Sequence, residues 1–282
     1  ISKTFISDLM SLKSFEGKDV WYPPGVQWID KQPIIFGLRN IIFFGVGIPY
    51  FIMMLLGLYK SMKRGDLWVF MLVLWILGFF IYQSTQFAHT MRYFIFLYPF
   101  FAIFAAVGFQ QLLDFIQRYF SKLYVLIVVA CIGSILVYPL AFLAIYTKNH
   151  SRVAASEWIY KTLETDSLIL GEHWDDPLPL SVRNSYGKQF SIELLPVFEP
   201  DTPEKWKKME MLLAKADYYV LSSNRGWASI TTVPEKYPRM SKFYEDLLVG
   251  NVSFKKIGEF TSYPSLRYLG IPIDFSDDFA EE

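Results

Sequence analysis

The 282-residue chain carries 27 basic and 27 acidic residues, and this balance gives no reason to expect a nucleic-acid partner. Its single cysteine, Cys131, excludes an intramolecular disulfide and a cysteine-based metal site. Hydrophobic residues make up 53% of the chain and are concentrated between Ile41 and Tyr146. Length and composition therefore predict a membrane block followed by one small domain.

Residues 1–40 precede the apolar region, and we expect them to form an extracytoplasmic loop that contains a helix. Phe5, Leu9, Leu12 and Phe15 recur at helical spacing. The pattern fits a helix lying on the membrane surface and a helix packed on the protein's own core equally well. The prolines at 23 and 24 predict a turn or extended segment after it. Because the chain starts with Ile rather than Met, we expect it to be a piece of a longer protein.

Four uncharged stretches lie in the transmembrane block, which we place at residues 41–147. A helix needs about 20 apolar residues to cross the hydrocarbon core. The stretches are residues 41–59, 67–82, 93–108 (with an apolar pattern that continues to about 116) and 123–146. We therefore predict an all-α membrane block of about four transmembrane helices.

The orientation of these helices follows from the charges in the short connections. The loop 60–66 carries three basic residues, and the connection before residue 123 carries Arg118 and Lys122, whereas the loop 83–92 carries one. The positive-inside rule places the first and third connections in the cytoplasm. The N-terminal segment, the loop 83–92 and everything after residue 146 are then predicted to be extracytoplasmic.

The sequence pattern of residues 148–282 predicts a small extracytoplasmic α/β domain. Helical spacing covers residues 152–165, 203–215 and 241–249, and Thr202 or Asp201 is the expected N-cap of the second helix. Short apolar runs at residues 167–171, 217–222 and 254–260 read as strands. Helices that alternate with buried strands predict a small, partly parallel sheet.

A polar segment follows the first of these strands. Ligands bind at the carboxyl ends of strands in α/β sheets, so Glu172, His173, Asp175 and Asp176 are candidates for binding a metal or a sugar. Trp174 is a candidate for stacking on a sugar ring. The alternative is a polar loop in which the Asp residues cap a helix or form a turn, and the identity of any metal stays unknown.

A second candidate site is the extracytoplasmic loop that leads into the third span. Arg92 opens a lipid-embedded helix, and its planar guanidinium suits a lipid-linked phosphate. His89 lies one turn before Arg92 if the helix starts early. The alternative is an interfacial arginine whose charge reaches the water.

The segment from His89 to Pro99, His-Thr-Met-Arg-Tyr-Phe-Ile-Phe-Leu-Tyr-Pro, resembles a motif of polyprenyl-phosphate-sugar-dependent glycosyltransferases. These are the GT-C enzymes of the protein O-mannosyltransferase-like and aminoarabinose-transferase-like group (family 39-like). Phe96 replaces the first proline of their motif. Residues 26–40, 45–49, 153–160, 168–179 and 216–225 are also similar to prokaryotic members, so the resemblance covers most of the chain.

The resemblance implies a transferase in the plasma membrane of a prokaryote, acting at the extracytoplasmic face on a protein, lipid or glycan acceptor. The catalytic carboxylate of the family lies in an upstream loop, so we expect no catalytic residue in this fragment; a divalent cation in the full-length enzyme is conceivable. Arg92 with His89 would bind the donor phosphate. Weaker donor or acceptor candidates are Asp30, Lys31, Arg39, Trp174, Asp175 and Asp176. The competing hypothesis is a non-enzymatic membrane subunit or transporter half whose extracytoplasmic domain binds a ligand or partner.

Overall fold

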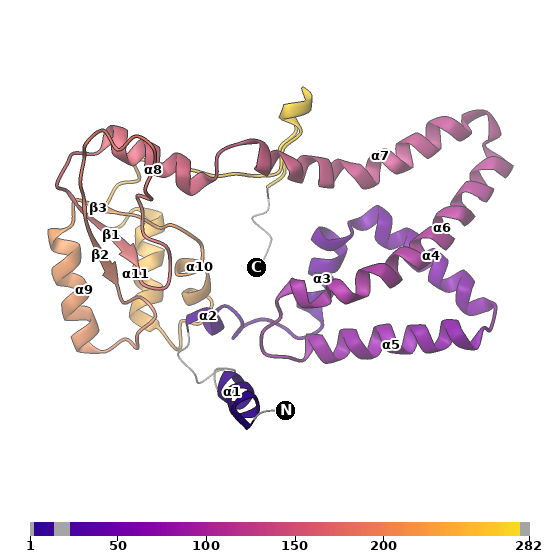
Figure 1. Cartoon of the computed structure of the whole chain (residues 1–282), viewed down its shortest axis with the longest axis horizontal. Coiled ribbons are helices and arrows are strands. Elements are labelled where there is room, and N and C mark those ends of the chain that lie inside the picture. Colours follow the sequence, from indigo (N-terminus) through magenta and orange to yellow (C-terminus); the bar gives the residue numbers. More distant parts are fainter. Residues whose placement is uncertain (1–2, 14–22, 277–282) are drawn as a thin grey trace. The chain divides into compact units, whose positions relative to one another are not determined.

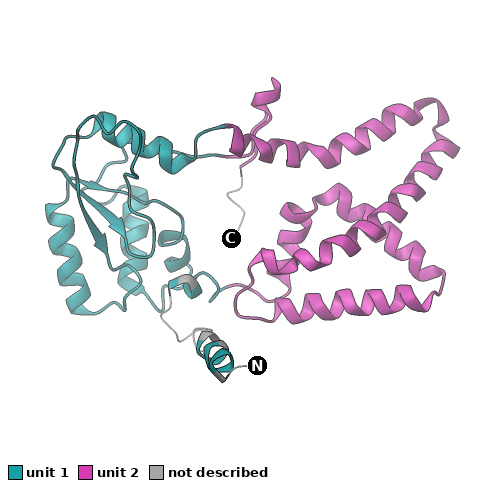
Figure 2. Ribbon diagram, in the orientation of Figure 1, with its two compact units in different colours: residues 1–30, 148–262 teal, residues 31–147, 263–282 magenta. Residues whose placement is uncertain are grey.

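The computed structural model describes residues 3–13 and 23–276, and the chain forms two compact units (Figure 2). The first unit comprises residues 1–30 and 148–262, and the second comprises residues 31–147 and 263–282. The apolar helices belong to the second unit and the sheet to the first. Residues 31–40 and 263–276 therefore cluster with the apolar helices.

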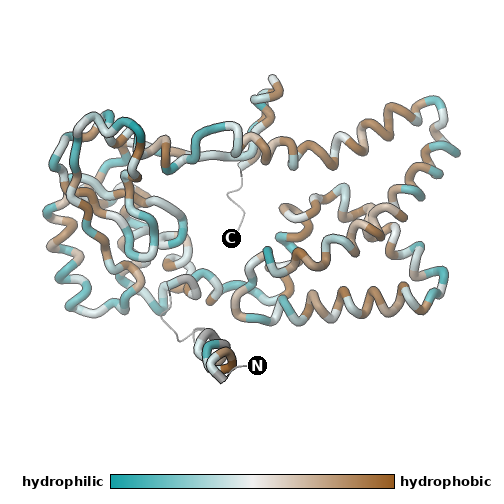
Figure 3. Tube along the Cα trace, viewed as in Figure 1, coloured by the Kyte–Doolittle hydropathy of each residue, from teal (hydrophilic) through white to brown (hydrophobic). Residues whose placement is uncertain are grey.

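The second unit is helical throughout most of its length (Figure 1). In chain order it contains α3 (Ile35–Asn40), the π-helix η1 (Ile41–Gly45), α4 (Ile48–Lys63), α5 (Leu67–Ser84), the 3-10 helix η2 (Met91–Leu97), α6 (Tyr98–Tyr119), η3 (Ser121–Leu123), α7 (Tyr124–Leu143), η4 (Ala144–Thr147) and, near the C-terminus, η5 (Arg267–Leu269). Among the described residues, three helical stretches are long and apolar enough to cross a membrane, the last of which continues from Ser121 to Thr162, and a bent pair makes a fourth candidate. Figure 3 shows α5 and α7 as almost continuously hydrophobic. The prediction of an integral membrane protein with about four spans agrees with these three to four candidate spans.

The first predicted span is not a continuous helix, which corrects the prediction for residues 41–59. The helical stretches Ile35–Gly45 and Ile48–Lys63 meet at an angle of 112°. Gly47 joins them with a φ of 79°, a left-handed conformation that glycine adopts without a steric penalty, and Pro49 starts α4. The apolar run hides this break because neither residue interrupts its hydrophobicity.

Residues 148–262 of the first unit form a small α/β domain. It contains α8 (Ser151–Thr162), β1 (Leu168–Glu172), β2 (Ser191–Leu195), α9 (Pro203–Lys215), β3 (Tyr218–Tyr219), α10 (Trp227–Ile230) and α11 (Pro238–Val249). The strands are parallel, in the order β2-β1-β3. The core lies between this sheet and α9 and α11, with Leu170, Met209 and Tyr244 fully buried. The prediction of a small, partly parallel sheet is confirmed.

Some predicted elements differ in detail. Residues 254–260 form no strand: Phe254 packs on the ring of Tyr219 and Phe260 on that of Trp158, so the apolar residues of this segment are held by ring contacts without a β-ladder. The edge strand β2 is absent from the predictions because its first three residues are exposed.

At the N-terminus, α1 (Lys3–Lys13) lies in the predicted helical segment, with Phe5 and Met10 exposed. Phe15 and the side chains of Leu9 and Leu12 lie outside the described residues, so the predicted apolar face of α1 stays untested. Pro23 and Pro24 begin the short helix α2 (Pro23–Val26), which corrects the prediction of a turn or extended segment there. Proline is tolerated in the first turn of a helix, where its missing N–H would have no partner.

Candidate functional site

Arg92 is the second residue of η2, the 3-10 helix that leads into α6. Side chains three residues apart lie above one another in such a helix. Phe94 and Leu97 form its inner row and are fully buried, whereas Ile95 and Phe96 are 62% and 64% exposed. The exposed Arg92 therefore stands at the start of an apolar, outward-facing surface.

The guanidinium group of Arg92 is placed by its neighbour in the chain. It lies 5.2 Å from the ring centre of Tyr93, and Nη2 is 3.5 Å from the Tyr93 hydroxyl. None of the ion pairs formed by residues 3–13 and 23–276 includes Arg92. The charge of Arg92 is thus not neutralised by a carboxylate in the described part of the chain.

His89 is only 4% exposed and lies outside the helix, which starts at Met91. Its ring meets that of Phe36 edge-on, with 5.7 Å between the ring centres. Burial lowers the pKa of His89, against the effect of hydrogen bonds with the backbone of Ser84 and Phe87. The imidazole is therefore neutral at neutral pH and carries no charge to attract an anion. Its contact with Phe36 makes it a residue that holds the loop in place.

The weaker candidates near the first span lie on both sides of the boundary between the two units. Asp30 is exposed and belongs to the first unit, whereas Lys31 and Arg39 belong to the second. The Lys31 ammonium lies 5.8 Å from the ring centre of Phe36, the same ring that His89 contacts. Lys31 and His89 are therefore brought together around Phe36.

The carboxyl end of the sheet holds a buried carboxyl group. Glu172 ends β1 and is 2% exposed, and its Oε1 accepts hydrogen bonds of 2.6 Å from the hydroxyls of both Tyr219 and Tyr244. Burial raises the pKa of Glu172, the two hydroxyls oppose this shift, and the nearby Asp175 adds to it. Oε2 has no hydrogen-bond partner among the described residues.

Arg152 of α8 links the loop that follows β1 to the rest of the domain. Its guanidinium bonds to Asp175 at 2.8 Å and Asp176 at 2.6 Å, and its Nε donates to the carbonyl of Ser222 at 3.3 Å. The Asp175 side chain is 5% exposed, so this ion pair is largely buried. Both predicted aspartates are therefore engaged in holding the loop.

Trp174 lies in the same loop with a φ of 76°, a left-handed conformation that is uncommon for a large side chain. Its carbonyl accepts a 2.6 Å hydrogen bond from Arg225, and its side chain is partly exposed. Strained backbone of this kind clusters at functional sites. The ring centre of Trp174 lies 5.5 Å from that of His173, and the stacking of Trp174 on a sugar stays a prediction.

Sequence reasoning missed Arg152, Arg225, Tyr219 and Tyr244 as parts of this site. Tyr219 and Arg225 follow from the rule that parallel strands end at the same edge, because they lie on or just after β3. Arg152 and Tyr244 come from helices and carry no local signal. Within the described ranges, no three His, Cys, Asp or Glu side chains are grouped so as to hold a metal ion.

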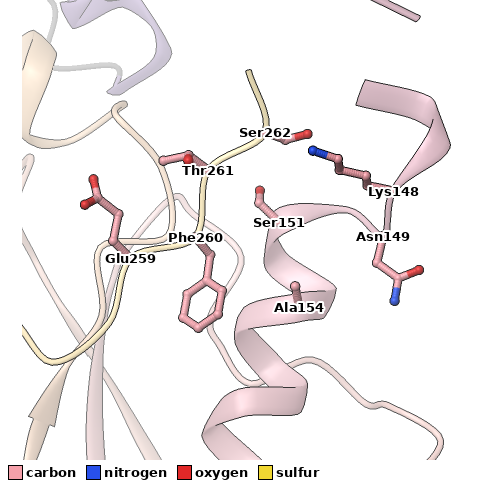
Figure 4. Close-up of a pocket in the computed structure, with 8 residues that line it drawn as sticks. All are labelled: Lys148, Asn149, Ser151, Ala154, Glu259, Phe260, Thr261 and Ser262. Atoms are coloured by element: carbon pink, nitrogen blue, oxygen red, sulfur yellow. The ribbon is translucent and has the colours of Figure 1, made fainter. Parts of the chain in front are cut away.

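An open depression of about 520 Å³ lies elsewhere in the first unit, between the start of α8 and residues 259–262 (Figure 4). Lys148 and Ser151 line one side, and Phe260 and Ser262 line the other. It is shallow and holds none of the predicted site residues.

Comparison with known proteins gives no relative from which a function could be taken. No protein family matches the chain, and no curated protein or solved structure matches it. The fold and the two clusters of residues are thus the observations from which a function has to be argued.

Proposed function

We propose that this chain is the C-terminal part of a membrane glycosyltransferase that uses a polyprenyl-phosphate-linked sugar at the extracytoplasmic face. The resemblance of residues 89–99 to such enzymes suggests the reaction, and the apolar helices supply a site within reach of a lipid-linked donor. The observation that carries the proposal is the guanidinium of Arg92, which forms no ion pair within residues 3–13 and 23–276 and lies at the start of an exposed apolar surface.

A polyprenyl phosphate has the complementary chemistry. Its phosphate would lie at Arg92, where two parallel N–H groups match two phosphate oxygens. Its hydrocarbon chain would follow Ile95 and Phe96, which are exposed on the outer side of η2. An unpaired arginine at the membrane interface is stabilised by such an anion.

In the proposed reaction, the bond between the anomeric carbon and the phosphate oxygen breaks, and the acceptor oxygen bonds to that carbon. An upstream carboxylate takes the proton from the acceptor hydroxyl. The electron pair of the broken bond leaves with the polyprenyl phosphate, whose growing negative charge Arg92 stabilises. His89, neutral and packed against Phe36, holds the loop that presents Arg92.

The sheet edge is the proposed place for the acceptor. Trp174 offers an exposed ring, and Asp175 and Asp176 are fixed by Arg152 beside it. The same edge supports the second candidate function, a non-enzymatic membrane subunit whose domain binds a ligand. Among the described residues, the buried carboxyl group of Glu172 is hydrogen-bonded only by Tyr219 and Tyr244 of the α/β domain itself, so this cluster needs no residue of the apolar helices.

The test is sugar transfer by the full-length protein in vesicles with a polyprenyl-phosphate-linked donor. Arg92→Ala should lower kcat/KM by about 100-fold, the typical effect of removing one donor that stabilises a developing charge. Arg92→Lys should recover only part of it, because an ammonium lacks the two-pronged geometry.

Arg118→Ala is the matched control, because Arg118 stands at the other end of α6 and lies over the next tyrosine at 5.5 Å, as Arg92 does at 5.2 Å. Equal effects of the two alanine variants would exclude Arg92 as the donor site. Absence of any transfer by the wild-type protein, together with ligand binding by the domain, would favour the second candidate function.

A further inference from the structure

The segment from Pro264 to Phe275, called here the 264–275 loop, belongs to the unit of apolar helices and crosses the end of α7 (Figure 1). Ser265 N–H donates to the carbonyl of Ala141 at 2.9 Å, and the Tyr268 hydroxyl donates to that of Leu140 at 2.7 Å. Both carbonyls lie in the last turn of α7, which ends at Leu143. The loop is therefore fixed at the depth of the end of a membrane span.

The outer surface of the loop is apolar. Leu269, Ile271 and Ile273 are 50%, 43% and 44% exposed, and Tyr268 is exposed beside them. Loops of water-soluble surfaces rarely expose such a run of aliphatic side chains. The loop is hydrogen-bonded to the end of α7, a hydrophobic helix whose residues are mostly not buried by the protein.

The backbone of the loop is almost completely hydrogen-bonded without water. Eight of the ten backbone N–H groups between Ser265 and Phe275 donate to protein oxygens, most of them inside the loop itself. Pro272 has no N–H to satisfy. Because a backbone polar group without a partner costs several kcal/mol where water is scarce, this internal pairing suits a loop at the boundary between headgroups and acyl chains.

The two charges of the loop cancel each other. Arg267 and Asp274 are its only ionisable acidic or basic residues. Nε of Arg267 lies 2.8 Å and 3.0 Å from the two carboxylate oxygens of Asp274, and Nη2 lies 2.5 Å from one of them. A charged side chain is costly to place close to lipid unless it is paired with an opposite charge, and the pair Arg267–Asp274 meets this condition.

We propose that the 264–275 loop is a lipid-binding anchor that inserts Leu269, Ile271 and Ile273 into the leaflet that holds the C-terminal end of α7. The partner is the boundary between headgroups and acyl chains, where Tyr268 is also favoured. The anchor would fix the end of α7, the point from which the chain passes to the α/β domain. This role is independent of the proposed sugar transfer.

The test is the depth of a spin label in phosphatidylcholine vesicles that hold the full chain. Cys131→Ser removes the single native cysteine, and Leu269→Cys or Ile271→Cys then carries the label. The measured quantity is the ratio of collisions with oxygen, which concentrates in lipid, to collisions with a water-soluble nickel chelate. We expect a ratio several-fold higher at position 269 than at Leu248→Cys, a matched control on α11 with 54% exposure in the water-soluble domain.

Val129→Cys, on the exposed surface of α7, gives the value for a lipid-facing position. Equal ratios at positions 269 and 248 would overturn the proposal. So would a label at position 269 that neither reagent reaches, because that result would mean that protein covers the loop.

Discussion

Gly57 of α4 and Gly108 of α6 face one another where these two helices of the apolar unit pack together. A Cβ at Gly57 would overlap the carbonyl oxygen of Phe104, and one at Gly108 would overlap that of Met53. Small residues of this kind let two membrane helices approach until their backbones touch. The packing of α4 on α6 therefore depends on the absence of both side chains.

The first prediction is that Gly108→Ile separates α4 from α6. The new side chain meets backbone, which cannot move aside as a side chain does, so we expect a loss of at least about 2 kcal/mol in the free energy of unfolding. Thermal unfolding in detergent measures it. Gly78→Ile is the control, because a Cβ at Gly78 has no atom within 4 Å. Equal melting temperatures for the two variants would show that the contact contributes nothing.

The second prediction concerns the raised pKa of Glu172, which burial causes against the two tyrosine hydroxyls. An unfolded glutamate has a pKa of about 4.3, so above that pH the folded state binds more protons than the unfolded state. The contribution of Glu172 to stability is therefore full below about pH 4.3 and declines as the pH rises through the higher folded pKa.

Glu172→Gln should flatten this decline, because an amide can accept from Tyr219 and Tyr244 without ever ionising. Urea unfolding of the full chain at about pH 5 and about pH 8, followed by tryptophan fluorescence, measures the slope. Glu193→Gln, at an exposed position on β2, is the control and should leave the slope unchanged. The same decline in the Glu172→Gln variant as in the wild type would assign it to another group.

The third prediction concerns the buried pair of Asp201 and Lys205, 3.0 Å apart. Burial alone would raise the pKa of Asp201, but hydrogen bonds from Lys205, Met240 N–H and Trp206 outweigh it and lower that pKa. This stabilisation is present above about pH 3.9, the unfolded pKa of an aspartate, and is lost as the pH falls through the lower folded value.

Asp201→Ala should cost about 3–5 kcal/mol, because it leaves the ammonium of Lys205 buried without its counter-charge. Glu210→Ala is the control: its partner Arg239 lies 3.3 Å away and both side chains are more than half exposed. We expect it to cost less than about 1 kcal/mol. Chemical denaturation measures both, and a loss below that of Glu210→Ala would contradict the role of Asp201.

The sequence reveals the membrane helices because lipid demands long uncharged runs, but it hides the break at Gly47, which is as apolar as its surroundings. It also predicts one strand that does not form and misses the strand β2. Residues 254–260 have strand-like composition but are held by the rings of Tyr219 and Trp158, whereas the exposed start of β2 carries little hydrophobic signal. Residues 254–260 are more exposed than their composition suggests, whereas the start of β2 is exposed as its composition suggests and so gives no signal of a strand.

The candidate site is partly predictable for a similar reason. The residues after β1 can be named from the strand that precedes them, so Trp174, Asp175 and Asp176 are found. Their partners come from helices that pack on the sheet. Arg152 lies on α8, and Tyr244, whose hydroxyl bonds to Glu172, lies on α11, 72 residues from Glu172 in the chain. Such contacts depend on how helices dock on the sheet, which no local pattern specifies.

The last prediction separates the two roles that Trp174 can have. Its φ of 76° costs about 1–3 kcal/mol for a residue other than glycine. Glycine adopts this conformation freely, so Trp174→Gly removes the strain together with a ring that is 39% exposed. We expect the stability to stay within about 1 kcal/mol of the wild type.

Trp206→Ala is the contrasting variant, because Trp206 is 7% exposed in the core and donates to Asp201 at 3.1 Å. It should cost about 3–5 kcal/mol. If the ring of Trp174 stacks on a sugar, Trp174→Gly should weaken transfer by raising KM while stability is preserved. A loss of unfolding free energy as large as that of Trp206→Ala would instead show that the ring of Trp174 stabilises the fold. A side chain whose role is to bind a ligand is expected to contribute little to the core.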